Sequence, residues 1–263
     1  MKTLNMLESP EYPTLLTRHD GVSDNVIGAD NQQGQPLISG SPQRLRQLKS
    51  PKHKSMIVGA VLGDSYITKN HDGSGHLLAT QHSGKQRDYL EHKRERMALM
   101  GFQVSRVYDV SRNGFESYRY TAKLDEDGRY WRHQFYPNGN KTVTRHLLNM
   151  LDAEGLAIWF MDDGSNTLHK QGGRGELQLH TQSFNRAEHH IIQNYLDKVW
   201  GIDTGLRTDT RGDKIYYHLS ILAANKSRFV ELLRPHIHVS MQYKIDIESC
   251  RSKEGLKTLE AMV

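Results

Sequence analysis

Two short apolar runs in this chain of 263 residues end in aspartate, and these aspartates are its clearest candidates for chemistry. The first run reads Met56-Ile-Val-Gly-Ala-Val-Leu-Gly-Asp64, and the second reads Leu156-Ala-Ile-Trp-Phe-Met-Asp-Asp163. A carboxylate at the C-terminal end of a helix is disfavoured by the nearby carbonyl dipoles by up to ~1 kcal/mol, so a bound cation explains its presence better. Carboxylate and carbonyl oxygens together form a hard-oxygen site that suits Mg²⁺.

The alternative interpretation of each run is a buried core helix that happens to end in a carboxylate. Gly59 and Gly63 argue against it, because they are spaced i, i+4 on one helix face and glycine costs a helix roughly 1 kcal/mol relative to alanine. Such a face predicts the close approach of a second helix backbone. If the two helices pack side by side, Asp64 and Asp163 converge, and two carboxylates with divalent ions match the needs of phosphodiester hydrolysis.

The polar residues that follow each run repeat in the same order. Each aspartate is followed by a glutamine, Gln81 or Gln182, and later by a lysine, Lys141 or Lys244. The matching aspartates are 99 positions apart, the glutamines 101 and the lysines 103, a drift that small loop insertions would produce. We therefore expect one structural plan to occur twice in the chain.

The hydrophobic periodicity predicts the elements that must position these residues. Each half is expected to follow the order α-β-β-α-β-β-α, giving an α+β fold in which two pseudo-symmetric repeats form a saddle of antiparallel sheets. Expected helices cover 86–100, 127–136, 185–200 and 225–234, and expected strands cover 117–124, 176–182 and 214–221. In the last strand Ile215, Tyr217, Leu219 and Ile221 should face the core, with Lys214, Tyr216, His218 and Ser220 on the opposite face.

Composition sets the boundaries around the two halves. We expect residues 1–47 to form a disordered leader with a basic end, 48–150 the first repeat, 151–247 the second repeat and 248–263 a tail. The single cysteine, Cys250, excludes a disulfide scaffold and a cysteine-based zinc site. No apolar segment predicts a secretory signal or a membrane span, so an intracellular location is expected, in a bacterial or phage cytoplasm or an organelle matrix.

With its motifs taken together, the sequence resembles the LAGLIDADG homing endonucleases, in the branch that carries both motifs in one chain. The nine motif positions fall on Ile57–Ser65 and on Leu156–Gly164. The resemblance covers about residues 48–247, and it extends to the segments Lys85–His92, His180–Phe184 and Met241–Lys244. It implies a monomeric, site-specific endonuclease that cleaves both strands of DNA and uses Mg²⁺ or Mn²⁺.

The resemblance also implies roles for particular residues. Asp64 and Asp163 would bind the catalytic metals, Lys141 and Lys244 would lie beside the scissile phosphates, and Gln81 and Gln182 would belong to the polar surroundings. The alternative for each lysine is a solvated surface charge, and for each glutamine a structural role at a strand end.

The second motif departs from the family pattern. Ile158 and Asp162 replace the two glycines of the first motif, so the helix interface cannot be symmetric. Asp162 also raises the question of which carboxylate is the metal ligand, and register with Asp64 favours Asp163.

Antiparallel strands fit the major groove of DNA, where each base pair presents its own pattern of donors and acceptors. Candidate readers are Arg106, Arg112, Arg119 and Lys123 in the first half and Arg207, Arg211, Lys214 and His218 in the second. Each could equally be a solvated charge on a strand face. The basic segment 41–54 could add phosphate contacts, and since the halves differ, the expected target is long and asymmetric.

Two other functions remain open from the sequence. An intron RNA maturase would use the same fold to assist splicing, with intron RNA as its partner. A DNA-binding regulator without catalysis would be expected to lack a motif aspartate, whereas both aspartates and both lysines are present here. No membrane partner is expected.

Overall fold

The computed structural model describes residues 50–71, 73, 75–124, 127–167 and 176–247. The expected leader (1–47), the tail (248–263) and most of the basic segment lie outside these residues. The positions of the repeat boundaries therefore stay predictions. Within the described part of the chain, no helix is long and apolar enough to cross a bilayer.

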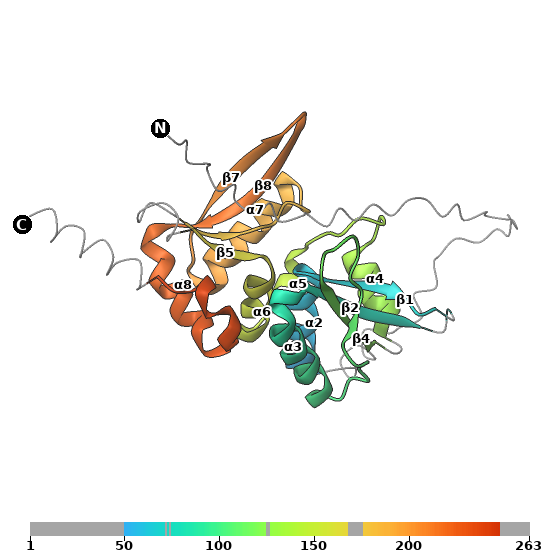
Figure 1. The fold of residues 1–263 in the computed structure, drawn as a ribbon. Coiled ribbons are helices and arrows are strands. Elements are labelled where there is room, and N and C mark those ends of the chain that lie inside the picture. The colour runs from blue at the N-terminus through green and yellow to red at the C-terminus, as the bar shows by residue number, and fades with distance from the viewer. Residues whose placement is uncertain (1–49, 72, 74, 125–126, 168–175, 248–263) are drawn as a thin grey trace, which may run out of the picture. The chain divides into compact units, whose positions relative to one another are not determined.

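The first half builds one four-stranded antiparallel sheet with helices before and between its strands (Figure 1). The order of the strands in the sheet is β1-β2-β4-β3, so β2 pairs with both β1 and β4. The elements are α2 (Pro51–Leu62), β1 (Ser65–Lys69), β2 (His76–Ser83), α3 (Arg87–Leu99), β3 (Tyr108–Asp109), β4 (Ser117–Lys123), α4 (Gly128–Phe135) and α5 (Arg145–Leu148).

The second half repeats this topology, with strand order β5-β6-β8-β7. Its elements are α6 (Ala153–Asp163), β5 (Gly164–Asn166), β6 (Leu177–Leu179), α7 (Arg186–Tyr195) with a π-helical turn (Leu196–Trp200), β7 (Thr204–Arg211), β8 (Lys214–Ile221) and α8 (Lys226–Leu233). The expected α-β-β-α-β-β-α plan and the α+β fold class are confirmed in both halves.

Local sequence signals explain where these helices begin and end. Asn185 and Glu188 form a reciprocal capping box at the start of α7, so two otherwise unpaired N–H groups are satisfied. Gly101 and Gly201 follow the two matching helices with φ values of +84° and +64°, a conformation that glycine adopts without steric cost.

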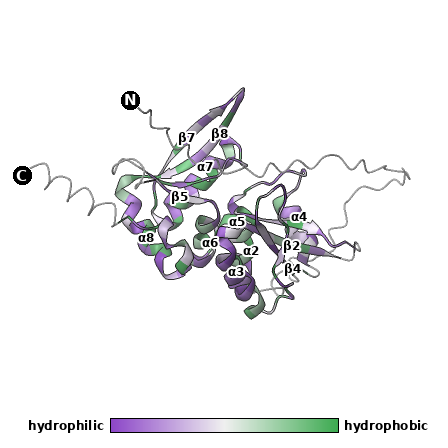
Figure 2. Ribbon diagram, viewed as in Figure 1, coloured by the Kyte–Doolittle hydropathy of each residue, from purple (hydrophilic) through white to green (hydrophobic). Residues whose placement is uncertain are grey.

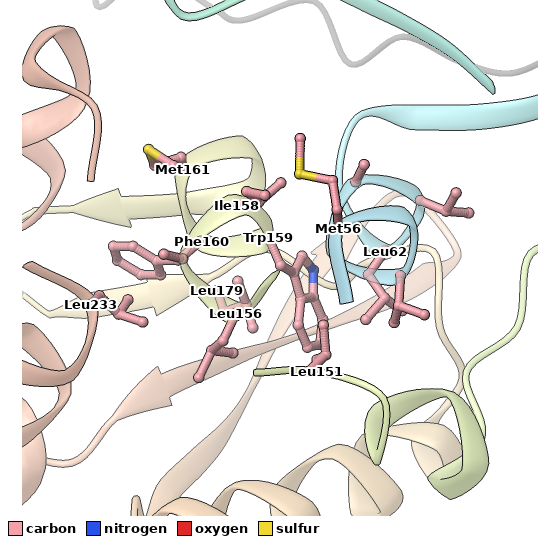
Figure 3. Packing of buried hydrophobic residues seen from close by; sticks show 14 of the residues in the cluster. Met56, Leu62, Leu151, Leu156, Ile158, Trp159, Phe160, Met161, Leu179 and Leu233 are labelled. Carbon is pink, nitrogen blue, oxygen red and sulfur yellow. The ribbon is translucent and has the colours of Figure 1, made fainter. Parts of the chain in front are cut away.

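Helices α2 and α6 pack against each other and form the centre of the core. Every residue from Met56 to Leu62 is buried, and so is every residue from Leu156 to Met161. A helix that is apolar on all sides is expected only in such a fully covered position. Figure 2 shows α2 as largely hydrophobic, whereas the more peripheral α3 is mostly hydrophilic. In Figure 3, Trp159 of α6 is turned toward α2 and Phe160 toward Leu233 of α8.

The glycines of the first motif let the two helices approach closely, as expected from their spacing. A Cβ atom on Gly59 would lie 2.2 Å from the carbonyl oxygen of Gly155, and one on Gly63 would lie 2.5 Å from the Asp162 side chain. The expected asymmetry of the interface is also present: a glycine meets a glycine at one crossing and an aspartate at the other. Gly155, which stands outside the nine motif positions, was missed in the sequence.

The expectation for strand 214–221 is wrong for part of its length. Ile215 was expected in the core and is 59% exposed, whereas His218 and Ser220 were expected on an open face and are buried. The reason is that β7 and β8 pair over eight residues, while β6 joins β8 only opposite Leu219 and Ser220. The outer end of the hairpin therefore has no third strand, and its base is covered on both faces. Strand β6 is likewise shorter than the expected 176–182, although burial still alternates through Gln182.

Candidate active site

The two motif aspartates leave their helices in different ways. Helix α2 ends at Leu62, and Asp64 follows in a turn with 38% of its side chain exposed. Asp163 is the last residue of α6 and is partly buried. Burial and then the nearby Asp64 carboxylate raise the pKa of Asp163 well above its usual value. The effect of Asp64 on Asp163 agrees with the expected convergence of the two carboxylates.

Each half also brings its lysine to the end of its own motif helix. The Lys141 ammonium donates to the carbonyl oxygens of Leu62 (3.0 Å) and Gly63 (2.8 Å). The Lys244 ammonium donates in the same way to Met161 and, at 3.1 Å, to Asp162. A cation at these carbonyl groups stabilises the C-terminal end of a helix.

Neither Lys141 nor Lys244 is a solvated surface charge. Lys244 is buried, and Lys141 is half-buried with its ammonium held by two carbonyls. Burial lowers the pKa of both lysines, and the three aspartates of the site oppose that shift.

Asp162, the extra carboxylate of the second motif, is held in a buried cage. The Lys93 ammonium donates to both of its oxygens at 2.9 and 2.7 Å, and the Tyr89 hydroxyl donates at 3.0 Å. The backbone N–H of Asp64 donates to Oδ2 at 3.1 Å. Burial alone would raise the pKa of Asp162, but the Lys93 ammonium, His82 and these hydrogen bonds hold it below its usual value.

His82 joins the two carboxylates of this cage. Its Nδ1 lies 3.3 Å from Asp64 Oδ2 and 3.0 Å from Gln86 Oε1, and its Nε2 lies 3.7 Å from Asp162. Burial and then the Lys93 charge lower the pKa of His82, and the carboxylates of Asp162 and Asp64 oppose that shift. Among the described residues, Asp64, His82 and Asp162 have ligand atoms within 4.8 Å of one another and could hold a metal ion. His82 was missed in the sequence, where it only follows Gln81.

The two glutamines contact side chains on their sheets. Gln81 accepts from Arg119 at 2.6 Å and donates to Ser117 at 3.2 Å. Gln182 contacts His180 Nδ1 at 3.2 Å. Burial and then the neighbouring His218 lower the pKa of His180 to about 4, so His180 is neutral and accepts from the glutamine amide. Gln81 is thus tied to β4, and Gln182 to His180, whose backbone N–H donates to the Asp163 carbonyl oxygen.

Most of the candidate DNA readers share one face of their sheet. Cross-strand partners project from the same side, and Gln81 pairs with Arg119 while Leu77 pairs with Lys123. In the second sheet, Arg207 pairs with His218 and Arg211 with Lys214, again on one face. Arg106 and Arg112 are exposed but precede and follow β3, so they lie on loops.

Comparison with known proteins gives the chain its relatives. A family model described as the LAGLIDADG DNA endonuclease family matches residues 54–229. The chain is 28% identical over 210 residues to the protein RecA of Mycolicibacterium fallax, which covers 76% of this chain and 47% of that protein. It is 26% identical to the cytochrome b mRNA maturase bI2 of Debaryomyces hansenii, with 72% of each protein covered.

The chain spans about half the length of the RecA relatives it matches. Among solved structures, it resembles the homing endonuclease I-WcaI bound to its DNA recognition sequence, with a TM-score of 0.59, 23% identity and coverage of 80% of this chain and 95% of that one. At this identity the likeness establishes the fold. The family match covers both motifs and the sheets between and after them, and this chain therefore belongs to the LAGLIDADG DNA endonuclease family.

Proposed function

We propose that this protein is a site-specific endonuclease that hydrolyses both strands of DNA with Mg²⁺ or Mn²⁺ held by Asp64 and Asp163. The observation that carries the proposal is the repeated pairing at the end of each motif helix. Each half places one carboxylate and one buried or half-buried lysine at the carbonyl end of its helix, and the two helices pack together. Two like centres side by side suit the cleavage of two strands.

The donor set fits a hard divalent cation. The carboxylates of Asp64 and Asp163 are oxygen ligands, which Mg²⁺ prefers, whereas the terminal carbonyl groups beside them already accept from Lys141 and Lys244. When bound, such an ion polarises the phosphate and activates a water molecule.

Lys141 and Lys244 supply positive charge beside the scissile phosphates in this proposal. Each ammonium is desolvated and held by carbonyl groups beside the motif aspartate of its half, so a phosphate oxygen bound at that aspartate would lie near its positive charge. Gln81 and Gln182 would orient neighbouring polar groups, Gln81 through Arg119 and Gln182 through His180.

Sequence recognition is proposed for the basic faces of the two sheets. Arg119 and Lys123 in the first sheet and Arg207, Arg211 and Lys214 in the second would contact base edges or phosphates, with Arg106 and Arg112 contributing from loops. His218 is buried at the base of its hairpin and is therefore not proposed as a DNA contact. The two sets differ in composition, which favours an asymmetric target. Arg207 forms an ion pair with Glu176 in the free protein. On binding, Arg207 would give up this ion pair and contact DNA instead.

The test uses the purified chain with a randomised library of double-stranded DNA. We expect cleavage of a narrow set of sequences in Mg²⁺ or Mn²⁺, and loss of cleavage when the ion is chelated. If a library of full coverage stays intact while the protein still binds DNA, the endonuclease proposal is wrong and a DNA-binding regulator takes its place.

An RNA function is the second candidate, favoured by the match to a cytochrome b mRNA maturase over 72% of both chains. Splicing of a labelled host intron with and without the protein distinguishes the two functions. A maturase would accelerate splicing, and it would do so even with Asn at positions 64 and 163.

A further inference from the structure

The carboxylate of Asp162 already accepts four hydrogen bonds, so a metal ion in the cluster of Asp64, His82 and Asp162 would compete with them. An ionised carboxylate has about four lone-pair directions. Lys93 takes one on each oxygen, the Tyr89 hydroxyl takes another on Oδ1, and the Asp64 N–H takes another on Oδ2. A metal ion would have to displace a donor, and displacing Lys93 would leave a buried ammonium without its partner, which is strongly unfavourable.

The donors around Asp162 all come from the other half of the molecule. Tyr89 and Lys93 are one turn apart on α3, and Asp64 follows α2, whereas Asp162 belongs to α6. Gly63 makes room for this arrangement, because any Cβ there would collide with the Asp162 side chain at 2.5 Å. The aspartate that replaces a glycine in the second motif thus fits against the glycine that remains in the first.

The contact to Asp64 is needed because Asp64 lies outside its helix. Asp163 is held by the last turn of α6, but Asp64 lies in a turn and its side chain is 38% exposed. A hydrogen bond from its N–H to the buried Asp162 carboxylate, which Lys93 and Tyr89 also bind, restrains the backbone of Asp64, and His82 contacts the Asp64 carboxylate. Displacement of a reacting group by about 1 Å can cost a hundredfold in rate.

We propose that Asp162 is a positioning residue and not a metal ligand: with Lys93 it forms a buried ion pair between the two halves that fixes Asp64, and it leaves metal binding in the second half to Asp163. This inference rests on the proposed function. In that function, the two adjacent acids of the second motif have separate tasks: Asp162 positions Asp64, and Asp163 binds the metal ion. This division also makes the two cleavage centres unequal, because the ion pair supports Asp64 directly and Asp163 only through α6.

The first test measures the structure of the free protein and needs no cleavage. Hydrogen exchange of the Asp64 amide is followed in the wild type, in Asp162→Ala and in Lys93→Met. We expect the Asp64 amide to be protected in the wild type and to exchange about tenfold faster in both variants. Asp162→Ala removes the acceptor of its hydrogen bond, and Lys93→Met removes the cation that holds this acceptor in place. Glu154→Gln is the matched control, because the Arg96–Glu154 pair also joins α3 to α6 but lies away from Asp64. Unchanged protection in Asp162→Ala would overturn the proposal.

The second test separates the two acids by counting bound Mn²⁺ with electron paramagnetic resonance on the protein–DNA complex. We expect Asp163→Asn to lose Mn²⁺ and Asp162→Asn to keep the wild-type number. Loss of an ion from Asp162→Asn with none lost from Asp163→Asn would show that Asp162 is the ligand. A wild type that binds no Mn²⁺ would instead contradict the proposed function, and the amide measurement would still decide whether Asp162 positions Asp64.

The third test separates positioning from general stability. In the double variant Lys93→Met with Asp162→Leu, both charges are replaced by apolar groups, so stability should return while the acceptor for the Asp64 N–H stays absent. We expect this folded variant to nick one strand of its target about tenfold more slowly than the other, with nicked DNA accumulating. Equal slowing of both strands, or full activity, would contradict the assignment.

Discussion

The ends of α2 and α6 perform the same proposed task in different surroundings. Each carries an aspartate and a lysine that binds two terminal carbonyls, yet Asp64 is partly exposed in a turn and Asp163 is more covered at its helix end. Helix α2 ends before Asp64, whereas α6 continues to Asp163, and the preceding motif position is Gly63 in one half and Asp162 in the other. The comparison teaches that a repeated sequence plan can keep its chemistry while one substitution ties the two halves together.

Removal of the Lys93 charge should cause the largest loss of stability, because it removes the partner of Asp162, the residue by which the second motif differs from the first. Lys93→Met leaves the buried Asp162 carboxylate without a counter-ion, which is expected to lower the free energy of unfolding by about 3–5 kcal/mol. Urea denaturation measures it. Glu154→Gln, which opens a partly exposed pair between the same helices, should cost only about 0–1 kcal/mol. Equal losses in the two variants would mean that the buried pair has no special role.

Substitution of the two lysines sharpens the comparison of the catalytic ends. Lys141→Met and Lys244→Met should each slow cleavage about 10²–10³-fold, because each removes a desolvated positive charge beside the motif aspartate of its half. Single-turnover cleavage of the selected target gives both rates. A large loss for one lysine and none for the other would show that the halves do not share a mechanism.

A substitution at the contact between Gly59 and Gly155 should lower stability less than loss of the buried Lys93–Asp162 ion pair. Gly59→Ala places a methyl group where only 2.2 Å separates it from the carbonyl of Gly155, so the helices must move apart at a cost of about 1–3 kcal/mol. Thermal unfolding measures the loss. Gly139→Ala is not a suitable control, because Gly139 has a positive φ; Gly75→Ala, with open space around it, is expected to be neutral.

The smallest effect is expected at the sheet surface. Gln81→Ala removes the hydrogen bond that holds the Arg119 side chain. The free energy of DNA binding should become less favourable by roughly 1 kcal/mol, the usual contribution of one hydrogen bond. Arg119→Ala should cost about 1–3 kcal/mol and relax the sequence preference at one position if the arginine reads a base. Quantitative binding to target and single-base variants checks both values. A loss that is uniform over all sequences would assign Arg119 to a phosphate.

Features that depend on local sequence were predictable. The capping box at Asn185, the glycine stops at Gly101 and Gly201 and the apolar motif helices all follow from residues within one or two turns of each other. The close approach at Gly59 and Gly63 was also expected, because glycine destabilises a helix relative to alanine and its presence twice on one face indicates a close helix contact. The repeat singled out Lys141 and Lys244, but their hydrogen bonds to the carbonyl groups at the helix ends were not predicted.

The cage around Asp162 was not predictable, because its donors lie 69 and 73 positions away in the chain. One signal was present: Tyr89, Lys93 and Met97 lie at successive i, i+4 positions on α3, so a lysine occupies the buried face of that helix. The burial of His218 was missed for a different reason. Strand periodicity gives the side of the sheet on which a residue lies, but it does not show how far a third strand or a neighbouring ring covers it.

The central claim is that each half supplies one essential aspartate. It is tested most directly by the Mg²⁺-dependent cleavage of the selected target by Asp64→Asn and by Asp163→Asn, each compared with the wild type for DNA affinity. We expect that neither variant cuts both strands and that both bind the target as the wild type does. Double-strand cleavage retained by either variant would contradict it.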